Sequence, residues 1–318
     1  MQLCRFYLPD EGPALSLSKE PALSLPKGAR LGQVVGGSVV DLTASGQPAF
    51  ATLSALLQAS VTTPIEALLR EVNLAALPAY AWRDLEREPA PGTPHLLPPV
   101  DRQEVWAAGV TYAWSREARV REARSKDVYV RVYDAERPEL FFKSTAEKVV
   151  GPHDWIGLRG DSHWNVPEPE LALVLNPAMH IVGTTIANDV SSRDIEGENP
   201  LYLPQAKIYR HACALGPVIT LAEGLDPQHL AIRLTVRRAA AGQPEAVAFQ
   251  GETSTAKMHR SLDELAGYLG RYNDFPDGAV LLTGTGIVPG DDFTLQDGDQ
   301  VLIEIEGIGT LCNPVRQM

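Results

Sequence analysis

The sequence predicts a β-rich α+β fold in two parts, and three observations support this prediction. Short apolar runs recur from residue 105 to residue 306, without the regular strand–helix alternation of a doubly wound sheet. Residues 89–99 contain five prolines and one glycine, which excludes a helix or a central strand. The hydrophobic fraction of 44% in 318 residues is enough for a real core. We therefore expect a small N-terminal α+β domain over residues 1–95 and a larger domain over residues 96–318.

The N-terminal part contains the signals of a small α+β unit. Strands around turns are predicted for residues 3–7 and 32–42, and helices for residues 51–59 and 64–72. A near-duplication of eight residues, at 13–20 and again at 21–28, lies between the two strand patterns. Two copies are too few for a repeat architecture. We interpret residues 13–28 as a surface insertion in a hairpin, without a function.

The larger part contains many strand-like runs and one clearly signalled helix. A capping box at residues 261–264 begins the helix, and Leu262, Leu265 and Leu269 supply its apolar face. The strand-like runs cover residues 105–110, 140–143, 170–175, 180–188, 217–221, 231–237, 279–283 and 300–306.

Charge and cysteine content exclude several classes of protein. The net charge of −12 argues against general nucleic-acid binding, which needs a basic surface. No apolar run approaches the roughly 18 residues that span a membrane. The N-terminus also lacks the basic start and apolar stretch of a signal peptide. The three cysteines, Cys4, Cys213 and Cys312, are odd in number and widely spaced, as in a reducing cytoplasm. We expect a cytoplasmic protein without nucleic-acid or membrane partners.

Three carboxylates lie in otherwise apolar, strand-like segments. Glu168 and Glu170 are two positions apart, so both point to one face of a strand, and a neighbouring strand can bring Asp189 to the same point. A buried carboxylate is costly unless a counter-charge compensates it. Three carboxylates without a nearby thiolate or imidazole suit a hard cation, Mg²⁺ first, with Mn²⁺ or Ca²⁺ as substitutes. Solvent-facing glutamates and a turn-capping aspartate are the alternative interpretation.

Further positions could do chemistry beside such a site. Lys207 stands alone in an apolar and aromatic stretch, where its ammonium could balance negative charge or shuttle a proton. Glu139 precedes one apolar strand, and the glycine-rich residues 283–286 end another. Glycines there let backbone amides and a threonine hydroxyl approach an anionic ligand. A snorkelling surface lysine, a strand-edge acid and a plain glycine turn are the alternatives. The seven histidines show no zinc-ligand spacing.

Together these segments resemble the fumarylacetoacetate hydrolase superfamily. The resemblance covers about residues 100–318, and five segments carry it in family order: residues 168–175, 187–194, 251–255, 282–286 and 300–310. It implies a mixed β-sandwich roll, with the N-terminal third as the small leading domain of many members. It also implies a divalent metal held by Glu168, Glu170 and Asp189, a 2-oxo acid bound to that metal, and a homodimer or homotetramer.

Two features indicate which of the reactions of this superfamily to expect. Members that cleave carbon–carbon bonds often carry a histidine–glutamate pair after a stretch like residues 109–112, and Ser115 stands about where that histidine is expected. Residues 191–209 closely resemble the 2-keto-3-deoxy-D-arabinonate dehydratase branch. In that branch a glutamate ahead of the metal pair and a lysine after the aspartate are the proposed acid/base residues, and Glu139 and Lys207 match them. Expected substrate contacts are Thr285, Arg116, Arg193 and Ser115.

The resemblance therefore implies a Mg²⁺-dependent dehydratase that converts 2-dehydro-3-deoxy-D-arabinonate to 2,5-dioxopentanoate and water in pentose catabolism. A base takes the C3 proton and an acid assists loss of the C4 hydroxyl, with Glu139 and Lys207 in either order. The alternative is a hydrolase of a 2,4-diketo sugar acid or a fumarylacetoacetate-type diketo acid, with Glu117 or His163 activating water. A catalytically silent relative that binds a 2-oxo acid or serves as an oligomeric scaffold is the third hypothesis. Residues 113–137 are either a mobile lid or a solvated helix.

Overall fold

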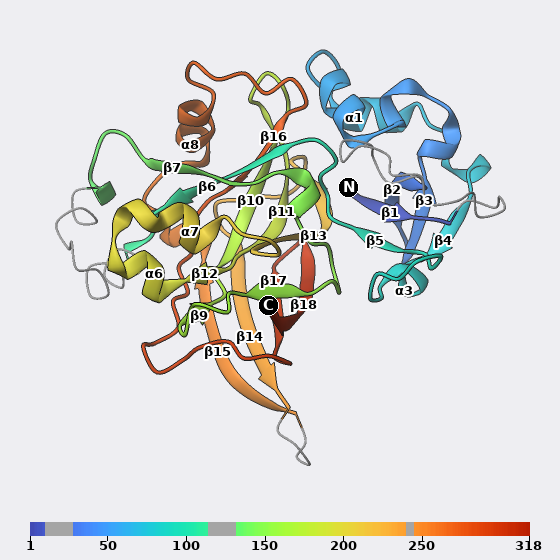
Figure 1. Cartoon of the computed structure of the whole chain (residues 1–318). Helices are drawn as coiled ribbons and strands as arrows, with labels where there is room; N and C mark the ends of the chain where they lie inside the picture. The colour runs from blue at the N-terminus through green and yellow to red at the C-terminus, as the bar shows by residue number, and fades with distance from the viewer. Residues whose placement is uncertain (10–27, 114–131, 240–244) are drawn as a thin grey trace, which may run out of the picture.

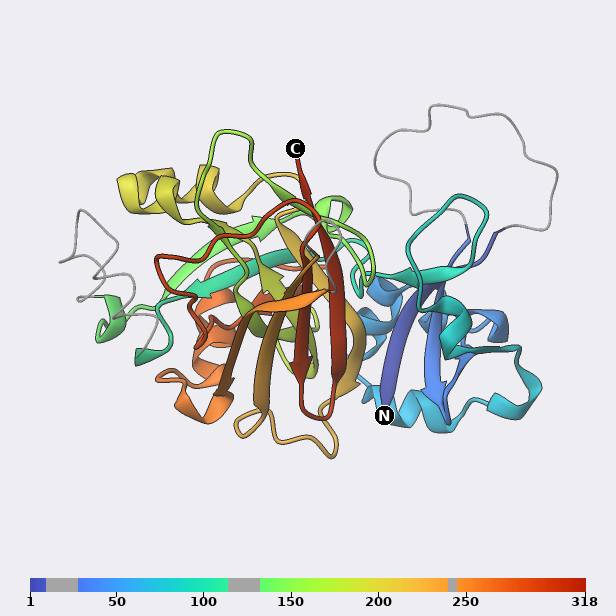
Figure 2. The same cartoon turned by 90° about the horizontal axis from the view of Figure 1, so that it is seen from below.

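A computed structural model of the chain describes residues 1–9, 28–113, 132–239 and 245–318. Within these residues two large β-sheets dominate, and short helices pack around them (Figure 1, Figure 2). Ser115, Arg116 and Glu117 lie outside the described residues, and so does the near-duplicated segment except for Gly28. No helix in the described ranges has both the length and the apolar character that a membrane span requires.

The first sheet runs through both parts of the chain. Strand β1 (Gln2–Tyr7) pairs antiparallel with β13 (Cys213–Leu221), so one sheet continues across the predicted domain division at residue 95. The division itself stays a prediction. Along the sheet the strands follow the order β4 (Ala79–Ala81), β3 (Ser38–Asp41), β2 (Ala29–Val35), β1, β13, β11 (Ile181–Asp189), β10 (Pro169–Leu175), β16 (Ala279–Leu282), β6 (Glu104–Gly109) and β7 (Glu139–Ser144), and β5 (His95–Leu97) pairs with β1.

The second sheet covers one face of the first. Leu173 of β10 and Ile186 of β11 share an apolar core with Leu234 and Ile303 of the second sheet. This packing confirms the predicted β-rich sandwich. The strands of the second sheet follow the order β15 (Ala246–Ser254), β14 (Ala231–Arg238), β17 (Gln300–Ile305), β18 (Gly309–Gln317) and β8 (Ile156–Leu158), and a separate small ladder joins β12 (Ser191–Ser192) to β9 (Asn165–Val166).

The helices are short, and several of them pack their apolar side chains against the sheets. In the N-terminal part, Leu56 and Leu69 pack in a second apolar cluster that includes Val174 of β10. At the predicted capping box, Ser261 Oγ accepts a hydrogen bond from Glu264 N at 3.1 Å, but the Glu264 carboxylate pairs with Arg260 instead. The helices are α1 (Leu53–Ala59), α2 (Ile65–Arg70), α3 (Trp82–Leu85), α6 (Arg193–Glu198), α7 (Leu203–Lys207) and α8 (Leu262–Leu269).

Every strand-like run predicted in the larger part overlaps a strand, but β15, β18 and the short β8, β9 and β12 were not predicted. Most residues of β15 are exposed and it lies at the edge of its sheet, so its sequence carries little apolar alternation. Strand β18 contains Gly309 and Pro314, which weaken a strand pattern. Strand β18 is extended because β17 and β8 pair with it on its two sides.

Asp101 links the beginning of α1 to the strand region that follows the proline-rich segment. Its carboxylate accepts hydrogen bonds from the amide of Leu53 at 2.7 Å and from the Ser54 hydroxyl at 2.5 Å. Gln103 Nε2 also donates to Asp101 Oδ1 at 3.0 Å. These bonds satisfy donors of the first helical turn, where a negative charge is stabilising.

We expect Asp101→Ala to lower the free energy of unfolding by about 1–3 kcal/mol, because it removes charged hydrogen bonds at a helix N-terminus. Urea unfolding measures this loss. The matched control is Asp274→Ala, at an exposed aspartate. Equal stability of the two variants would show that Asp101 does not anchor the helix.

Candidate metal centre

Strands β10 and β11 bring the three predicted carboxylates together. The strands are antiparallel neighbours, with Glu170 opposite Ala187. At their ends, Asp189 N donates to the Glu168 carbonyl at 3.0 Å, so these two residues lie side by side. One carboxylate oxygen from each of Glu168, Glu170 and Asp189 lies within 4.8 Å of the other two. All three residues are at most 2% exposed, so the alternative of solvent-facing glutamates is wrong.

Three cations compensate these buried carboxylates. Lys207 Nζ donates to Glu168 Oε2, Asp189 Oδ2 and Ser191 Oγ, each at 2.7 Å. Arg193 Nη2 lies 2.6 Å from Glu168 Oε1, and Lys143 Nζ lies 2.5 Å from Asp189 Oδ1. Lys207 is 2% exposed, which rules out a snorkelling surface lysine. Because an unpaired buried charge is so unfavourable, each pair depends on both of its members.

Glu170 is held differently, by the glycine-rich turn after β16. The amide of Gly284 donates to Glu170 Oε2 at 2.6 Å. Gly284 has a φ of +89°, and a Cβ there would lie 2.0 Å from Thr111 Oγ1, so the turn requires glycine. This amide therefore serves Glu170, whereas the sequence pattern suggested an external anion. Burial, and then the charges of Asp189 and Glu168, raise the pKa of Glu170 well above its ordinary value, although Lys207 and the Gly284 amide oppose the rise.

The donor set fits a hard divalent cation. All three groups offer carboxylate oxygens, the ligands that Mg²⁺ prefers in proteins. Among the described residues Asp189 Oδ1 accepts no hydrogen bond, although the Lys143 ammonium lies beside it, so its lone pairs are open to a cation. A cation would also relieve the repulsion that raises the pKa of Glu170.

A small cavity lies over the three carboxylates. Glu139 borders it from β7, directly opposite Gly109 of β6, and a Cβ on Gly109 would lie 2.1 Å from Glu139 Oε2. Glycine at this position therefore lets the Glu139 carboxylate lie against β6. The cavity is lined by Ala108, Gly109, Val110, Glu139, Phe141, Glu168, Glu170, Asp189, Glu196, Leu203, Lys207, Gly284 and Thr285.

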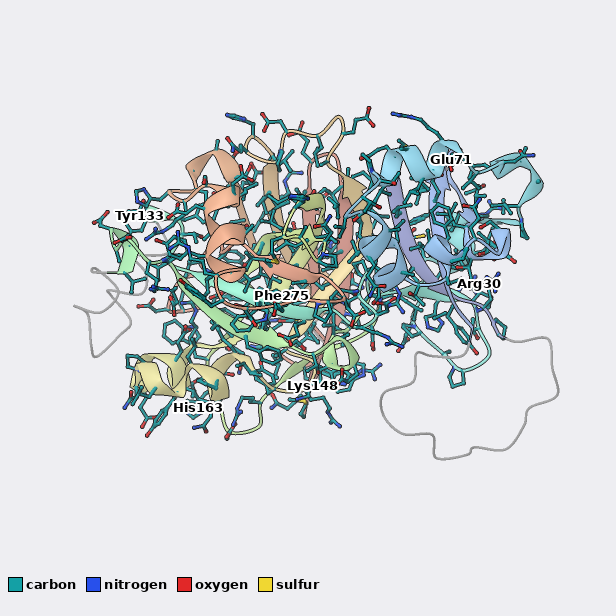
Figure 3. All side chains as sticks on the ribbon, turned by 90° about the horizontal axis from the view of Figure 1, so that it is seen from above. Arg30, Glu71, Tyr133, Lys148, His163 and Phe275 are labelled. Atoms are coloured by element: carbon teal, nitrogen blue, oxygen red, sulfur yellow. The ribbon has the colours of Figure 1, made fainter. Side chains whose placement is uncertain are left out.

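The structure brings some of the other predicted residues to this cavity and places others elsewhere. Thr285 lines it, with its hydroxyl donating to the Ile287 carbonyl at 3.1 Å. Arg193, predicted to contact substrate, is buried and paired with Glu168. The His163 side chain is 91% exposed at the periphery (Figure 3), with Nε2 3.6 Å from Asp194 Oδ2. Ser115 and Arg116 lie outside the described residues.

Sequence reasoning missed two charged residues of this region, Lys143 and Glu196. Lys143 ends an apolar run in β7, and a lone lysine in an apolar stretch is the same signal that identified Lys207. Glu196 is 3% exposed and follows Arg193 by three residues in α6, a spacing that places both on one helical face. That spacing was visible in the sequence, but the helix was not predicted.

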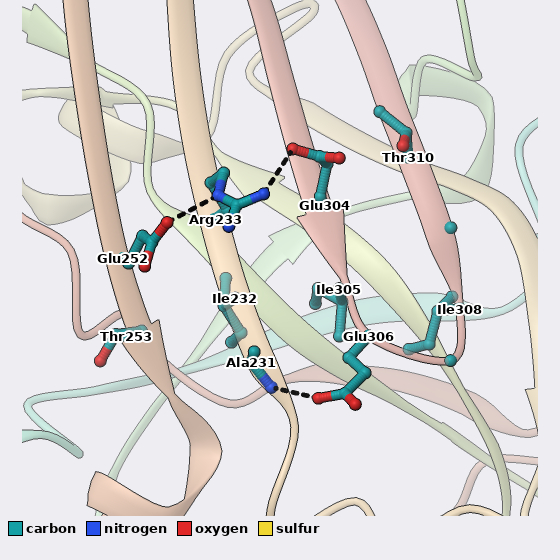
Figure 4. A pocket seen from close by; sticks show the side chains of 12 residues that line it. Ala231, Ile232, Arg233, Glu252, Thr253, Glu304, Ile305, Glu306, Ile308 and Thr310 are labelled. Atoms are coloured by element: carbon teal, nitrogen blue, oxygen red, sulfur yellow. Dashed lines mark hydrogen bonds and ion pairs between the residues drawn. The ribbon is translucent and has the colours of Figure 1, made fainter.

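A larger hollow, of about 530 Å³, lies over β14, β17 and β18 (Figure 4). Arg233 crosses it and pairs with Glu252 at 2.7 Å and with Glu304 at 3.8 Å. The side chains of Arg233, Glu252 and Glu304 are about half exposed to solvent. Ion pairs between exposed side chains are common on protein surfaces and contribute little to stability. The buried carboxylates and lysines of the smaller cavity therefore form the stronger candidate site.

Comparison with known proteins identifies the family of this chain. The chain is 53% identical over 222 residues to a protein of Haloferax volcanii named probable 2-keto-3-deoxyxylonate dehydratase, covering 70% of this chain and 75% of the relative. It is 47% identical over 227 residues to the 2-dehydro-3-deoxy-D-arabinonate dehydratase of Saccharolobus solfataricus, covering 70% of this chain and 74% of that one.

A solved structure described as 2-keto-3-deoxy-D-arabinonate dehydratase complexed with magnesium and 2,5-dioxopentanoate is also similar. Its sequence is 35% identical, the TM-score is 0.73, and the match covers 100% of this chain and 99% of the other. Residues 104–316 match the family described as fumarylacetoacetate (FAA) hydrolase C-terminal, over the region that contains the carboxylates and lysines. This chain belongs to the fumarylacetoacetate hydrolase C-terminal family.

Proposed function

We propose that this protein is a Mg²⁺-dependent dehydratase that converts 2-dehydro-3-deoxy-D-arabinonate to 2,5-dioxopentanoate and water in pentose catabolism. One observation carries the proposal: Lys207 Nζ lies 2.7 Å from oxygens of two of the three clustered carboxylates, in a cavity that Glu139 also lines. The two dehydratase relatives, at 53% and 47% identity, support the same reaction class. The magnesium and 2,5-dioxopentanoate of the similar solved structure support the metal and the product.

Glu168, Glu170 and Asp189 would hold the metal through their clustered oxygens. When bound, Mg²⁺ would polarise the 2-oxo group of the substrate and favour loss of the C3 proton. The buried position of the cluster excludes bulk water and strengthens each electrostatic interaction there. Thr285 lines the same cavity and is our proposed contact for the substrate carboxylate or a hydroxyl. Arg193, and outside the described residues Arg116 and Ser115, stay proposed substrate contacts.

Lys207 and Glu139 are the proposed acid/base pair. One removes a proton from C3, and the other donates a proton to the C4 hydroxyl, which leaves as water. Proton shifts in the unsaturated alcohol that results give the C5 aldehyde, so the reaction needs no oxidant or reductant. Both residues line the cavity over the carboxylates, Lys207 from α7 and Glu139 from β7.

The hydrolase alternative needs a base to activate water. His163 is an exposed residue paired with Asp194 and is not among the residues that line the cavity. The other candidate base, Glu117, lies outside the described residues. The described part of the site therefore favours elimination over hydrolysis.

We further infer a homodimer or homotetramer and a cytoplasmic location. The assembly is what the family resemblance implies, and light scattering after gel filtration measures it. All three cysteines are free, two of them buried, which supports a reducing compartment.

We expect the purified protein with Mg²⁺ to convert 2-keto-3-deoxypentonates to 2,5-dioxopentanoate, measured by NMR of the aldehyde product. Lys207→Met should lower kcat by about 100-fold or more, because it removes a proton-transferring group. Lys148→Met, at an exposed lysine of the same region, is the matched control and should keep full activity.

Absence of the aldehyde, together with cleavage of a 2,4-diketo acid to pyruvate, would overturn the dehydratase proposal in favour of a hydrolase. Tight binding of a 2-oxo acid without turnover of either substrate would favour a catalytically silent relative.

We expect the affinity for Mg²⁺, measured by titration calorimetry, to rise with pH. The pKa of Glu170 is raised by burial and by Asp189 and Glu168, and only the ionised carboxylate binds a cation well. A proton must leave as the metal enters, so the observed enthalpy should change with the ionisation enthalpy of the buffer.

Glu170→Gln should weaken Mg²⁺ binding at least tenfold at every pH, because it removes one charged ligand. The exposed Glu147→Gln variant is its matched control. Wild-type affinity in Glu170→Gln would show that the metal binds elsewhere.

A further inference from the structure

Lys143 is a second lysine of the site, and it lies where it cannot act on a substrate directly. Its side chain is fully buried on β7. Three oxygens surround its ammonium: Asp189 Oδ1 at 2.5 Å, the Lys207 carbonyl at 2.5 Å and the Val190 carbonyl at 3.2 Å. The two carbonyls accept hydrogen bonds from the ammonium, and the Asp189 carboxylate forms an ion pair with it.

Two of these contacts lead to groups on which the proposed reaction depends. Lys143 contacts one oxygen of Asp189, and Lys207 binds the other at 2.7 Å, so two ammonium groups fix the plane of this carboxylate. Lys143 also donates to the backbone of Lys207 itself. One side chain therefore ties β7 to the end of β11 and to the end of α7.

The hydrogen bond from Lys143 to the end of α7 is important because this helix has little stability of its own. It has five residues, Leu203–Lys207, and isolated helices shorter than about 12 residues are marginal in water. Lys207 is the last of them, and carbonyls in the last helical turn have no partner within the helix. The Lys143 ammonium supplies that partner. The position of the Lys207 backbone, and with it the reach of its Nζ, depends on this bond.

We propose that Lys143 is a positioning residue that fixes Lys207 and Asp189 relative to each other. The proposal rests on the proposed function for its catalytic consequence, but not for its structural one. A misplacement of about 1 Å in a reacting group can lower a rate about 100-fold. Loss of the Lys143 ammonium should therefore shift Lys207 relative to Asp189 and lower kcat, whereas β10 and β11 still hold the backbones of the metal ligands.

The test compares Lys143→Met, which keeps the length and apolar stem of the side chain, with Lys148→Met at the exposed lysine five residues later (Figure 3). In Lys143→Met we expect amide hydrogen exchange of residues 203–208 at least tenfold faster, with exchange in α8 unchanged. Mg²⁺ affinity should stay equal or become tighter, because the cation no longer faces a neighbouring positive charge. The value of kcat should fall about 10- to 100-fold, with KM within about threefold. Lys148→Met should match wild type throughout.

Unchanged exchange at residues 203–208, or unchanged kcat in a folded Lys143→Met protein, would overturn the proposal. Weaker Mg²⁺ binding, with kcat restored by excess Mg²⁺, would also overturn it, since Lys143 would then act on the metal alone. If Lys143→Met does not fold, Lys143→Gln keeps an N–H donor at the position and is measured in the same way. If the dehydratase proposal fails, kcat has no substrate to report on, but hydrogen exchange and metal affinity still decide the role of Lys143.

Discussion

The balance of charge around three buried carboxylates is the constraint on which this site depends. Glu168, Glu170 and Asp189 are almost inaccessible to water, and such charges are tolerated only when paired. Lys207, Lys143 and Arg193 supply that pairing for Glu168 and Asp189 from α7, β7 and α6, and the Gly284 amide donates to Glu170. Elements that are far apart in sequence are therefore held together by the same few ionic contacts that would orient metal and substrate.

The fold supplies the rigid part of this arrangement. Strands β10 and β11 lie in the middle of a continuous sheet whose apolar face is covered by the second sheet. Their antiparallel register places the carboxylates at one end of both strands, where the apolar core gives way to the cavity. The lysines and Arg193 come partly from short helices, which depend on these contacts for their position.

Local patterns in the sequence predicted much of this structure. The spacing of Glu168 and Glu170 predicted that they share one face, and strand periodicity located most strands of the larger part. Tertiary context decided the rest. No local pattern in the sequence predicts the contact between Lys143 and Asp189, because β7 and β11 are not neighbours in the sheet. Strand β18, with Pro314 in it, is extended because of the partners on both sides.

The central claim is that the three carboxylates together bind one divalent cation, and Mn²⁺ reports its position directly. Anomalous diffraction from Mn²⁺-soaked crystals should show one ion bonded to an oxygen of each of Glu168, Glu170 and Asp189, with Lys207 still beside Asp189. A Mn²⁺ peak at other residues, with Glu168 and Asp189 still paired only to Lys207, Lys143 and Arg193, would contradict the account.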